Sequence, residues 1–172
     1  MKSYVVNNEL RESVKRKEIT QTELSNRVFR AKTTVNGYFR GDPAPLEALE
    51  EMAHTIDDSL LSQNFSHRVF DMLPPMESDT YQTNPMSLDI IQMMESNERK
   101  ALKQKAMFAM AKQKGARSQE DTDAIQEYAF NFLDEVLVEM RYIVSILEKV
   151  DMSLMSAIKQ RMPDWKAKKY VR

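Results

Sequence analysis

Thr20-Gln-Thr-Glu-Leu-Ser-Asn-Arg-Val-Phe-Arg-Ala-Lys-Thr-Thr-Val-Asn-Gly-Tyr-Phe-Arg-Gly41 is the stretch of sequence that decides the fold. Its pattern predicts two short helices joined by a tight turn at residues 29–31. Thr20 is suited to cap the first helix, and Glu23 three residues later completes the pattern of a capping box. Gly41 is suited to end the second helix, because glycine readily adopts the left-handed conformation found there.

Each of these two helices has an apolar side and a polar side. The apolar residues that we expect to face inward are Leu24, Val28, Val35, Tyr38 and Phe39. The other side of the second helix presents Lys32, Thr33 and Asn36. Two short helices with a small outward polar set on the second are typical of a helix-turn-helix, whose second helix enters the major groove of DNA.

The stretch resembles the Cro/CI-like (XRE) helix-turn-helix family, without gaps from Ile19 to Gly41 and more loosely from Val6 to about Leu61. The matching features are the Thr-Gln-x-Glu-Leu opening, Leu24, Val28, Val35 in the usual Ile/Val position and the closing Arg-Gly. The resemblance implies a complete domain of five helices that binds double-stranded DNA. It further implies a transcriptional regulator of bacterial or phage type, acting as a homodimer on two half-sites.

The sequence departs from the family in three places. Phe29 stands where the family usually has the turn glycine, so we expect a distorted turn, and Ser25 replaces the usual alanine. The third departure concerns a pair that the family commonly forms between an arginine and a glutamate, whose positions here hold Val14 and Phe39. Losing both charges for apolar residues is compatible with stability, whereas losing one would leave a buried charge unpaired. The paired change therefore favours a real three-dimensional core over a helical hairpin that merely looks like the motif.

Followed residue by residue, the resemblance assigns DNA contacts to Gln21, Arg30, Lys32, Thr33, Asn36 and Arg40. Lys32 would donate to guanine O6/N7, and the Thr33 methyl would meet a thymine methyl. Gln21 would contact the DNA backbone, Asn36 lies one turn along the outward face, and Arg30 and Arg40 would hold phosphates. Gly37 falls where many relatives place a base-reading side chain, so readout is expected to be lost there and DNA shape to matter more.

The composition of the 172 residues sets broad limits. There are no cysteines, which excludes disulfides, thiolate zinc sites and cysteine catalysis. The first six residues are too short and polar for a signal peptide, and no apolar run approaches membrane-spanning length. Three glycines and few alternating β-branched runs predict an all-α protein, expected in the cytoplasm.

The net charge of −1 shows no global attraction to DNA, so binding has to come from local charge. Residues 11–40 carry eight basic and three acidic residues, a net +5, whereas residues 42–58 carry six acids and a net −6. We expect the first segment to face phosphates and the second to face away from them.

Two prolines, Pro74 and Pro75, end the predicted fifth helix, and residues 74–85 form a polar linker. The predicted organisation is therefore a DNA-binding domain at 1–73, a linker at 74–85 and a helical oligomerisation or interaction domain at 86–172. In this last part Asn84 and Pro85 begin one helix, Gly115 marks a turn, and Ser118 with Asp121 begins the next helix.

The last helix is expected to continue to Met162, with a kink expected at residues 151–153. Its apolar positions from Ala129 to Ile158 recur about every 3.6 residues, and a second parallel stripe widens that face. A bundle is therefore favoured over a simple left-handed zipper. The residues expected to mediate oligomerisation are Phe132, Val136, Met140, Ile143, Leu147 and Leu154.

Charge predicts an antiparallel hairpin in the C-terminal half. Residues 98–117 carry a net +6 and residues 120–139 a net −7, so folding about Gly115 sets opposite charges side by side. The less favoured alternative is that the basic residues of 98–117 form a second contact with DNA. The tail from Lys159 to Arg172 carries a net +5 and is expected to be frayed or disordered, where it would add non-specific phosphate affinity.

No enzymatic site is indicated. His54 and His67 are isolated, which argues against a metal site, and neither a phosphate loop nor a nucleophile elbow is present, so no cofactor is expected. The 13 methionines either pack in an ordinary core or form an adaptable surface for a protein partner. The leading hypothesis is a DNA-binding regulator that acts as a repressor. The alternative is an interaction protein on the same scaffold, an antirepressor or inhibitor whose Met-rich helical half binds a protein.

Overall fold

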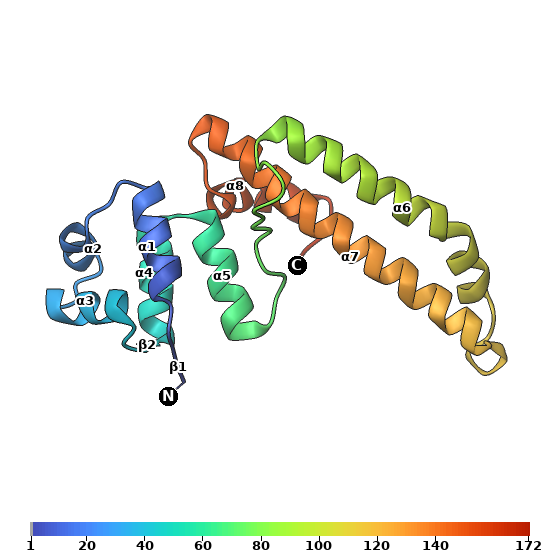
Figure 1. Ribbon diagram of the computed structural model, residues 1–172, viewed down its shortest axis with the longest axis horizontal. Helices are drawn as coiled ribbons and strands as arrows, with labels where there is room; N and C mark the ends of the chain where they lie inside the picture. The colour runs from blue at the N-terminus through green and yellow to red at the C-terminus, as the bar shows by residue number, and fades with distance from the viewer. Residues whose placement is uncertain (1) are drawn as a thin grey trace. The chain divides into compact units, whose positions relative to one another are not determined.

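The computed structural model describes residues 2–172, which are mostly helical (Figure 1). The α-helices are α1 (Asn7–Arg16), α2 (Gln21–Arg27), α3 (Lys32–Arg40), α4 (Leu46–Ile56), α5 (Ser59–Phe70), α6 (Pro85–Ala111), α7 (Gln119–Leu147) and α8 (Leu154–Ala167). Short 3₁₀ turns follow α6 and α7 at η1 (Lys114–Ala116) and η2 (Glu148–Val150). Two-residue strands β1 (Ser3–Tyr4) and β2 (Ala44–Pro45) pair antiparallel. The predicted all-α class is confirmed.

The chain divides into two compact units. The first unit contains the chain up to Pro75 together with Asp151–Arg172, and the second unit contains Met76–Val150. The sequence predicted instead that residues 86–172 form one domain. Helix α8 departs from that division, since it packs with the first unit.

Helices α1–α5 surround the core of the first unit. The side chains with less than 2% of their surface exposed include Val6, Leu10, Leu24, Val35, Leu49, Met52 and Leu61. Burying each such side chain contributes about 1.5–3 kcal/mol before conformational entropy is subtracted. Phe39 is buried within this core, and Val14 is partly buried against it.

The ends of α2 and α3 follow the expected local chemistry with one difference. The Thr20 hydroxyl accepts a hydrogen bond from the Glu23 amide at 3.1 Å, which confirms the N-cap. The Glu23 carboxylate, however, pairs with Arg27 one turn along α2, so a side-chain bond back to Thr20 is not part of the described structure. Gly41 ends α3 in the left-handed conformation with φ 112°, as expected.

The second unit is an antiparallel hairpin of α6 and α7, which run side by side (Figure 1). Asn84 caps α6 with Pro85 at the first position, and Ser118 and Asp121 form the predicted capping box of α7. Opposite charges pair across the hairpin, with Lys105 Nζ 2.9 Å from Glu120 Oε1 and Lys112 Nζ 2.6 Å from Asp121 Oδ1. The antiparallel arrangement predicted from charge is thereby confirmed.

The buried residues of α6 and α7 are mainly small or polar, with Leu88, Val138 and Val144 as aliphatic exceptions. The buried residues of the two helices are Leu88, Ser96, Ala106 and Ala109 on α6, and Ala124, Glu135, Val138, Arg141, Val144 and Ser145 on α7. Arg99 is ion-paired with Glu135, whose side chain is 4% exposed, and Gln92 Nε2 donates to Glu139 Oε1 at 3.1 Å. The periodic apolar positions of α7 lie only partly in the seam between the two helices, since Val136 is half-buried whereas Phe132 and Ile143 are each 45% exposed.

Helix α7 does not continue to Met162 as predicted. It ends at Leu147, and the chain then passes through η2 and a left-handed Asp151 (φ 52°) before Ser153 caps α8. The break thus includes the predicted kink at 151–153 but separates two helices. The tail is also more ordered than expected, because α8 is helical up to Ala167.

Hydrogen bonds fix the start of α8 to the corner between α4 and α5. Ser153 Oγ donates to Asp57 Oδ1 at 2.6 Å, and the Leu154 amide donates to Ser59 Oγ at 2.9 Å. Asp57 itself is the left-handed C-cap residue of α4. A single corner of the first unit therefore ends one helix and receives the start of another, separated from it by nearly 100 positions.

Candidate nucleic-acid interface

Helix α3 is anchored by one side and leaves the other side open. Val35, Tyr38 and Phe39 are buried, whereas Lys32, Thr33 and Arg40 are exposed. Among residues 2–172 neither Lys32 nor Arg40 takes part in an ion pair. Two cations and a hydroxyl are therefore available to a ligand along the outer side of this helix.

The N-terminus of α3 is also open. Its N-cap residue Ala31 provides no side-chain hydrogen bond, and the amides of Thr34 and Val35 are the first to bond back, both to the Ala31 carbonyl. The amides of Lys32 and Thr33 therefore remain available, and a helix N-terminus favours an anion. Helix α2 differs, because Thr20 caps it, while Gln21 lies exposed at its first position.

The C-terminal end of α3 is held in place by α1. Arg11 Nη2 donates to the Phe39 carbonyl oxygen at 2.7 Å, and the Gly41 amide donates to the Gly37 carbonyl at 3.1 Å. Arg11 was not singled out by the sequence pattern, which drew attention to Val14 one turn later. This bond satisfies a helix-terminal carbonyl that would otherwise lack a partner.

Asn36 is less available than the sequence indicated. The residue is half-buried, and its Oδ1 atom is buried without a hydrogen-bond partner in the described structure. A buried acceptor that lacks a donor costs about 1–3 kcal/mol. Only part of the Asn36 amide therefore faces outward beside Thr33 and Arg40.

Gly37 is buried beneath a side chain from the following loop. A Cβ atom added to Gly37 would overlap Asp42 Oδ2 and lie 3.2 Å from Asp42 Cγ. The Asp42 amide also donates to the Gly37 carbonyl at 2.9 Å. The position that the sequence treated as empty is thus occupied by a carboxylate.

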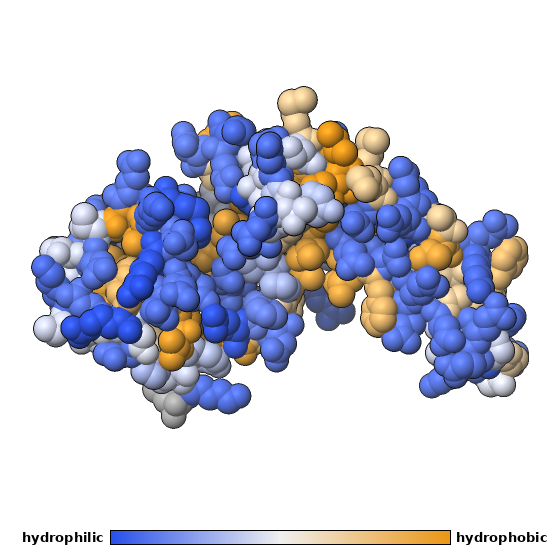
Figure 2. Space-filling view, viewed as in Figure 1, coloured by the Kyte–Doolittle hydropathy of each residue, from blue (hydrophilic) through white to orange (hydrophobic). Residues whose placement is uncertain are grey.

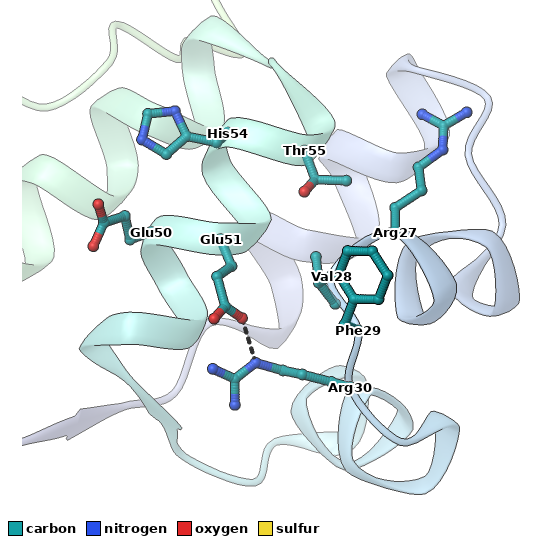
Figure 3. Close-up of a pocket in the computed structure, with 8 residues that line it drawn as sticks. All are labelled: Arg27, Val28, Phe29, Arg30, Glu50, Glu51, His54 and Thr55. Carbon is teal, nitrogen blue, oxygen red and sulfur yellow. Dashed lines mark hydrogen bonds and ion pairs between the residues drawn. The ribbon is translucent and has the colours of Figure 1, made fainter.

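Arg30 lies away from the outer side of α3 and is paired with α4 (Figure 3). Its Nε donates to Glu51 Oε2 at 2.6 Å, and this hydrogen bond raises the pKa of the Arg30 guanidinium above its ordinary value. The sequence assigned Arg30 to a phosphate. The structure uses it to tie the α2–α3 turn to α4, so its charge is already partly neutralised.

Phe29 occupies the turn between α2 and α3 in a left-handed conformation, with φ 51° and 97% of its surface exposed. The expected change in the turn is therefore a strained backbone with an outward aromatic ring. Beside it is a surface pocket of about 620 Å³ lined by Arg27, Val28, Phe29, Arg30, Glu50, Glu51, His54 and Thr55 (Figure 3). The sequence signal for this feature was a phenylalanine at a glycine position.

Charges within the first unit are less segregated than predicted. Acids of residues 42–58 neutralise basic residues of residues 11–40, as in the pair Arg30–Glu51 and in Arg16, whose Nη2 lies 2.8 Å from Asp58 Oδ1. The expectation that the two segments face in opposite directions is thus wrong at these two contacts. The basic residues of 11–40 that are exposed and form neither an ion pair nor a side-chain hydrogen bond in the described structure are Lys15 and Lys17 at the end of α1 and Lys32 and Arg40 on α3.

The residues predicted to mediate oligomerisation fall into two groups. Phe132, Val136, Met140, Ile143 and Leu147 all lie on α7, whereas Leu154 lies in α8 and belongs to the first unit. Val136, Met140 and Leu147 are half-buried, and Phe132 also stacks against the Arg99 guanidinium at 4.6 Å from the ring centroid. Five of the six residues therefore belong to one helix of the second unit, and the sixth belongs to the first unit.

Further apolar side chains are exposed on both helices of the hairpin, and Figure 2 shows side chains of this kind along it. The largest exposed fractions are those of Met86, Ile90, Met93, Met94 and Phe108 on α6, and of Phe130 and Leu133 on α7. A hairpin with a mainly small and polar seam and bulky apolar residues outside it is incompletely covered.

Among residues 2–172, no helix is long and apolar enough to cross a membrane, and no group of three or more His, Asp or Glu side chains is arranged to hold a metal ion. Comparison of the chain with protein-family models, with curated proteins and with solved structures found no significant match.

Proposed function

We propose that this protein is a sequence-specific DNA-binding transcriptional regulator of the bacterial or phage type, acting as a repressor in the cytoplasm. In this proposal α1–α5 form a Cro/CI-like helix-turn-helix domain in which α3 enters the major groove. The observation that carries it is α3 itself, buried along Val35, Tyr38 and Phe39 and open along Lys32, Thr33 and Arg40.

The roles of the exposed residues follow from their chemistry. Lys32, at the start of α3, is placed to donate to a guanine edge, and Thr33 beside it to meet a thymine methyl. Arg40, at the far end, and the uncapped amides at the near end are suited to phosphates. Gln21 at the start of α2 provides a further backbone contact. Arg30 is left out of this set because it is paired with Glu51.

A homodimer formed through the hairpin of α6 and α7 completes the proposal. The uncovered apolar side chains on both helices favour a second copy of the chain, because a two-fold contact buries the same surface on both partners. Two copies would also bring two α3 helices to two half-sites, which a single short recognition helix needs for useful affinity.

The test is a gel shift of the full chain against a genomic fragment pool across a salt series, followed by variants on the selected fragment. Lys32→Ala should weaken binding to the selected fragment more than binding to random DNA, because it removes a base contact. Arg40→Ala should weaken both about equally and reduce the slope of affinity against salt by about one. Lys149→Ala, which removes an exposed charge from the second unit, serves as the matched control. Equal losses on both DNAs for Lys32→Ala and Arg40→Ala would refute the assigned roles.

A second candidate function is an interaction protein on the same scaffold, such as an antirepressor or inhibitor whose hairpin binds a protein partner. The fully exposed Phe29 and the apolar exterior of α6 and α7 favour it. The same gel shift separates the two candidates, because an interaction protein would bind no fragment even at low salt, where phosphate contacts are strongest.

A further inference from the structure

Asp42 reaches over the outer side of α3 from the loop that follows it. Gly37 lies four residues after Thr33 and three before Arg40, so all three positions share one side of the helix. The space that a side chain at Gly37 would fill is occupied by the Asp42 carboxylate, whose Cγ lies 3.2 Å from an ideal Cβ at that position. The loop thus supplies a functional group at a position where the helix itself has none.

The geometry of the loop holds Asp42 in this position. Gly41 turns the chain in the left-handed conformation, and the Asp42 amide bonds to the Gly37 carbonyl at 2.9 Å. Pro43 follows directly and restricts the Asp42 backbone to extended conformations. The side chain is therefore oriented by three local constraints.

The carboxylate has no structural role within the described part of the chain. It joins no hydrogen bond or ion pair there, and the N-cap of α4 is Pro45, which receives no side-chain bond. Removing the carboxylate would therefore leave the fold intact. Both of its oxygens remain free to accept hydrogen bonds from a ligand.

A carboxylate in the major groove discriminates among bases because it only accepts hydrogen bonds. Guanine presents the acceptors N7 and O6, and thymine presents the acceptor O4 with a methyl group, so neither is favourable. Adenine offers an amino group next to its own acceptor N7, whereas the N4 amino group of cytosine is the donor from which Asp and Glu side chains accept in the major groove. Cytosine is the base that fits.

We propose that Asp42 is a specificity-determining residue of the DNA interface, which accepts a hydrogen bond from a cytosine N4 amino group at one position of each half-site. This inference rests on the proposed DNA-binding function. It replaces the expected loss of readout at Gly37 with readout by a residue five positions later. Since the carboxylate also repels phosphates, it lowers affinity for all sequences and so favours the cognate one.

The test compares DNA sequences selected from a random duplex pool by the full-length wild type and by Asp42→Ala. The wild type should select a C·G pair at one symmetric position, with about ten-fold weaker binding when that pair is replaced. Asp42→Ala should lose this preference, keep the preferences at the other positions and bind random DNA more tightly. Asp79→Ala, which removes an exposed acid outside the first unit, is the charge-matched control.

Gly37→Ala provides a second, independent variant. Its methyl group would displace the carboxylate, which is the end of a flexible side chain, so the melting temperature should be unchanged or raised. The loss of cytosine preference should match that of Asp42→Ala, and Gly37→Ala should add nothing in the Asp42→Ala background.

Three results would overturn the inference. One is an unchanged base preference in Asp42→Ala despite tighter binding, which would reduce Asp42 to a source of repulsion. Another is DNA binding by Asp42→Ala alone and not by the wild type, which would make Asp42 a block to binding. The third is failure of every variant to bind DNA at low salt, which would remove the proposed function together with this inference.

Discussion

At the scale of single residues, the turn between α2 and α3 contains an aromatic residue that the fold does not need. Phe29 has a positive φ of 51° and buries almost no surface. A left-handed backbone costs a non-glycine residue about 1–2 kcal/mol, and here no buried surface offsets it. Such uncompensated strain is typical of a residue kept for a contact outside its own domain.

Replacing this residue should stabilise the first unit. We expect Phe29→Gly to raise its free energy of unfolding by about 0.5–1 kcal/mol, because glycine adopts the left-handed conformation without strain. The measurement is denaturant unfolding followed by circular dichroism. Phe29→Ala retains the strain and should change stability little, so equal stabilisation by both variants would contradict this account.

Asn36, in the middle of α3, also carries a local energetic cost, because its buried Oδ1 has no hydrogen-bond partner in the described structure. We expect Asn36→Ala to increase stability by about 0.5–1 kcal/mol, because it removes an unsatisfied acceptor and improves helix propensity. Affinity for the selected DNA should fall in the same variant. Thermal unfolding and the gel shift measure the two effects, and a variant that is both less stable and equally tight on DNA would refute this assignment.

At the scale of elements, the hairpin of α6 and α7 depends on ion pairs that respond to acid. The hydrogen bond from Lys112 lowers the pKa of Asp121 from 3.8 to about 2, with a contribution from the Ser118 amide. A hydrogen bond from Arg99 likewise lowers the pKa of Glu135. Acids with lowered pKa values stabilise the folded state above the unfolded pKa, and this stabilisation is lost as the pH falls through the folded pKa.

The predicted window for Asp121 lies between about pH 4 and pH 2. A titration of its carboxyl carbon by NMR should give a pKa of about 2 in the wild type. In Lys112→Ala the value should move up toward 3.8, since the largest cause of the shift is removed. An unchanged pKa in that variant would show that the Ser118 cap alone is responsible.

Glu95 works in the opposite direction within the same hairpin. Burial and the neighbouring acids Glu98, Asp134 and Glu135 raise its pKa above the ordinary value. Its ionised form therefore opposes folding, and this penalty is relieved as the pH falls below the raised pKa. Protonation of Glu95 therefore stabilises the hairpin, whereas protonation of Asp121 or Glu135 removes a stabilising interaction.

At the scale of the whole molecule, the exposed apolar side chains of the hairpin bear on the oligomeric state. We expect Ile143→Glu, in a side chain that is 45% exposed, to weaken self-association of the full chain by roughly a hundred-fold. A two-fold interface would meet the introduced charge twice, once on each copy. Sedimentation equilibrium at micromolar concentration provides the measurement.

Gln113→Glu is the matched control, because it introduces the same charge at the exposed turn of the hairpin. It should leave association unchanged. A wild-type protein that sediments as a clean monomer at micromolar concentration would exclude the homodimer and would favour a protein partner for this surface.

Much of the local structure could be predicted from the sequence because it depends on neighbouring residues. The caps at Thr20, Asn84 and Ser118 and the left-handed Gly41 are set within a few positions of one another. The pairing of α6 with α7 was also predictable, since its two charge runs are adjacent in sequence and opposite in sign. Long apolar periods likewise located the helices, although they merged α7 and α8 into one.

The orientation of α7, the return of α8 to the first unit and the pairing of Arg30 with Glu51 were decided only in three dimensions. Periodicity shows that a helix has an apolar face, but not which neighbour covers it. Here small residues and the Arg99–Glu135 pair fill much of the seam. Likewise, the hydrogen bond between Ser153 and Asp57 joins residues that are 96 positions apart. The Asp42 side chain fills the space beside Gly37 because the loop after α3 turns back over that helix. Sequence determines what a residue offers locally, while packing decides which distant group it meets.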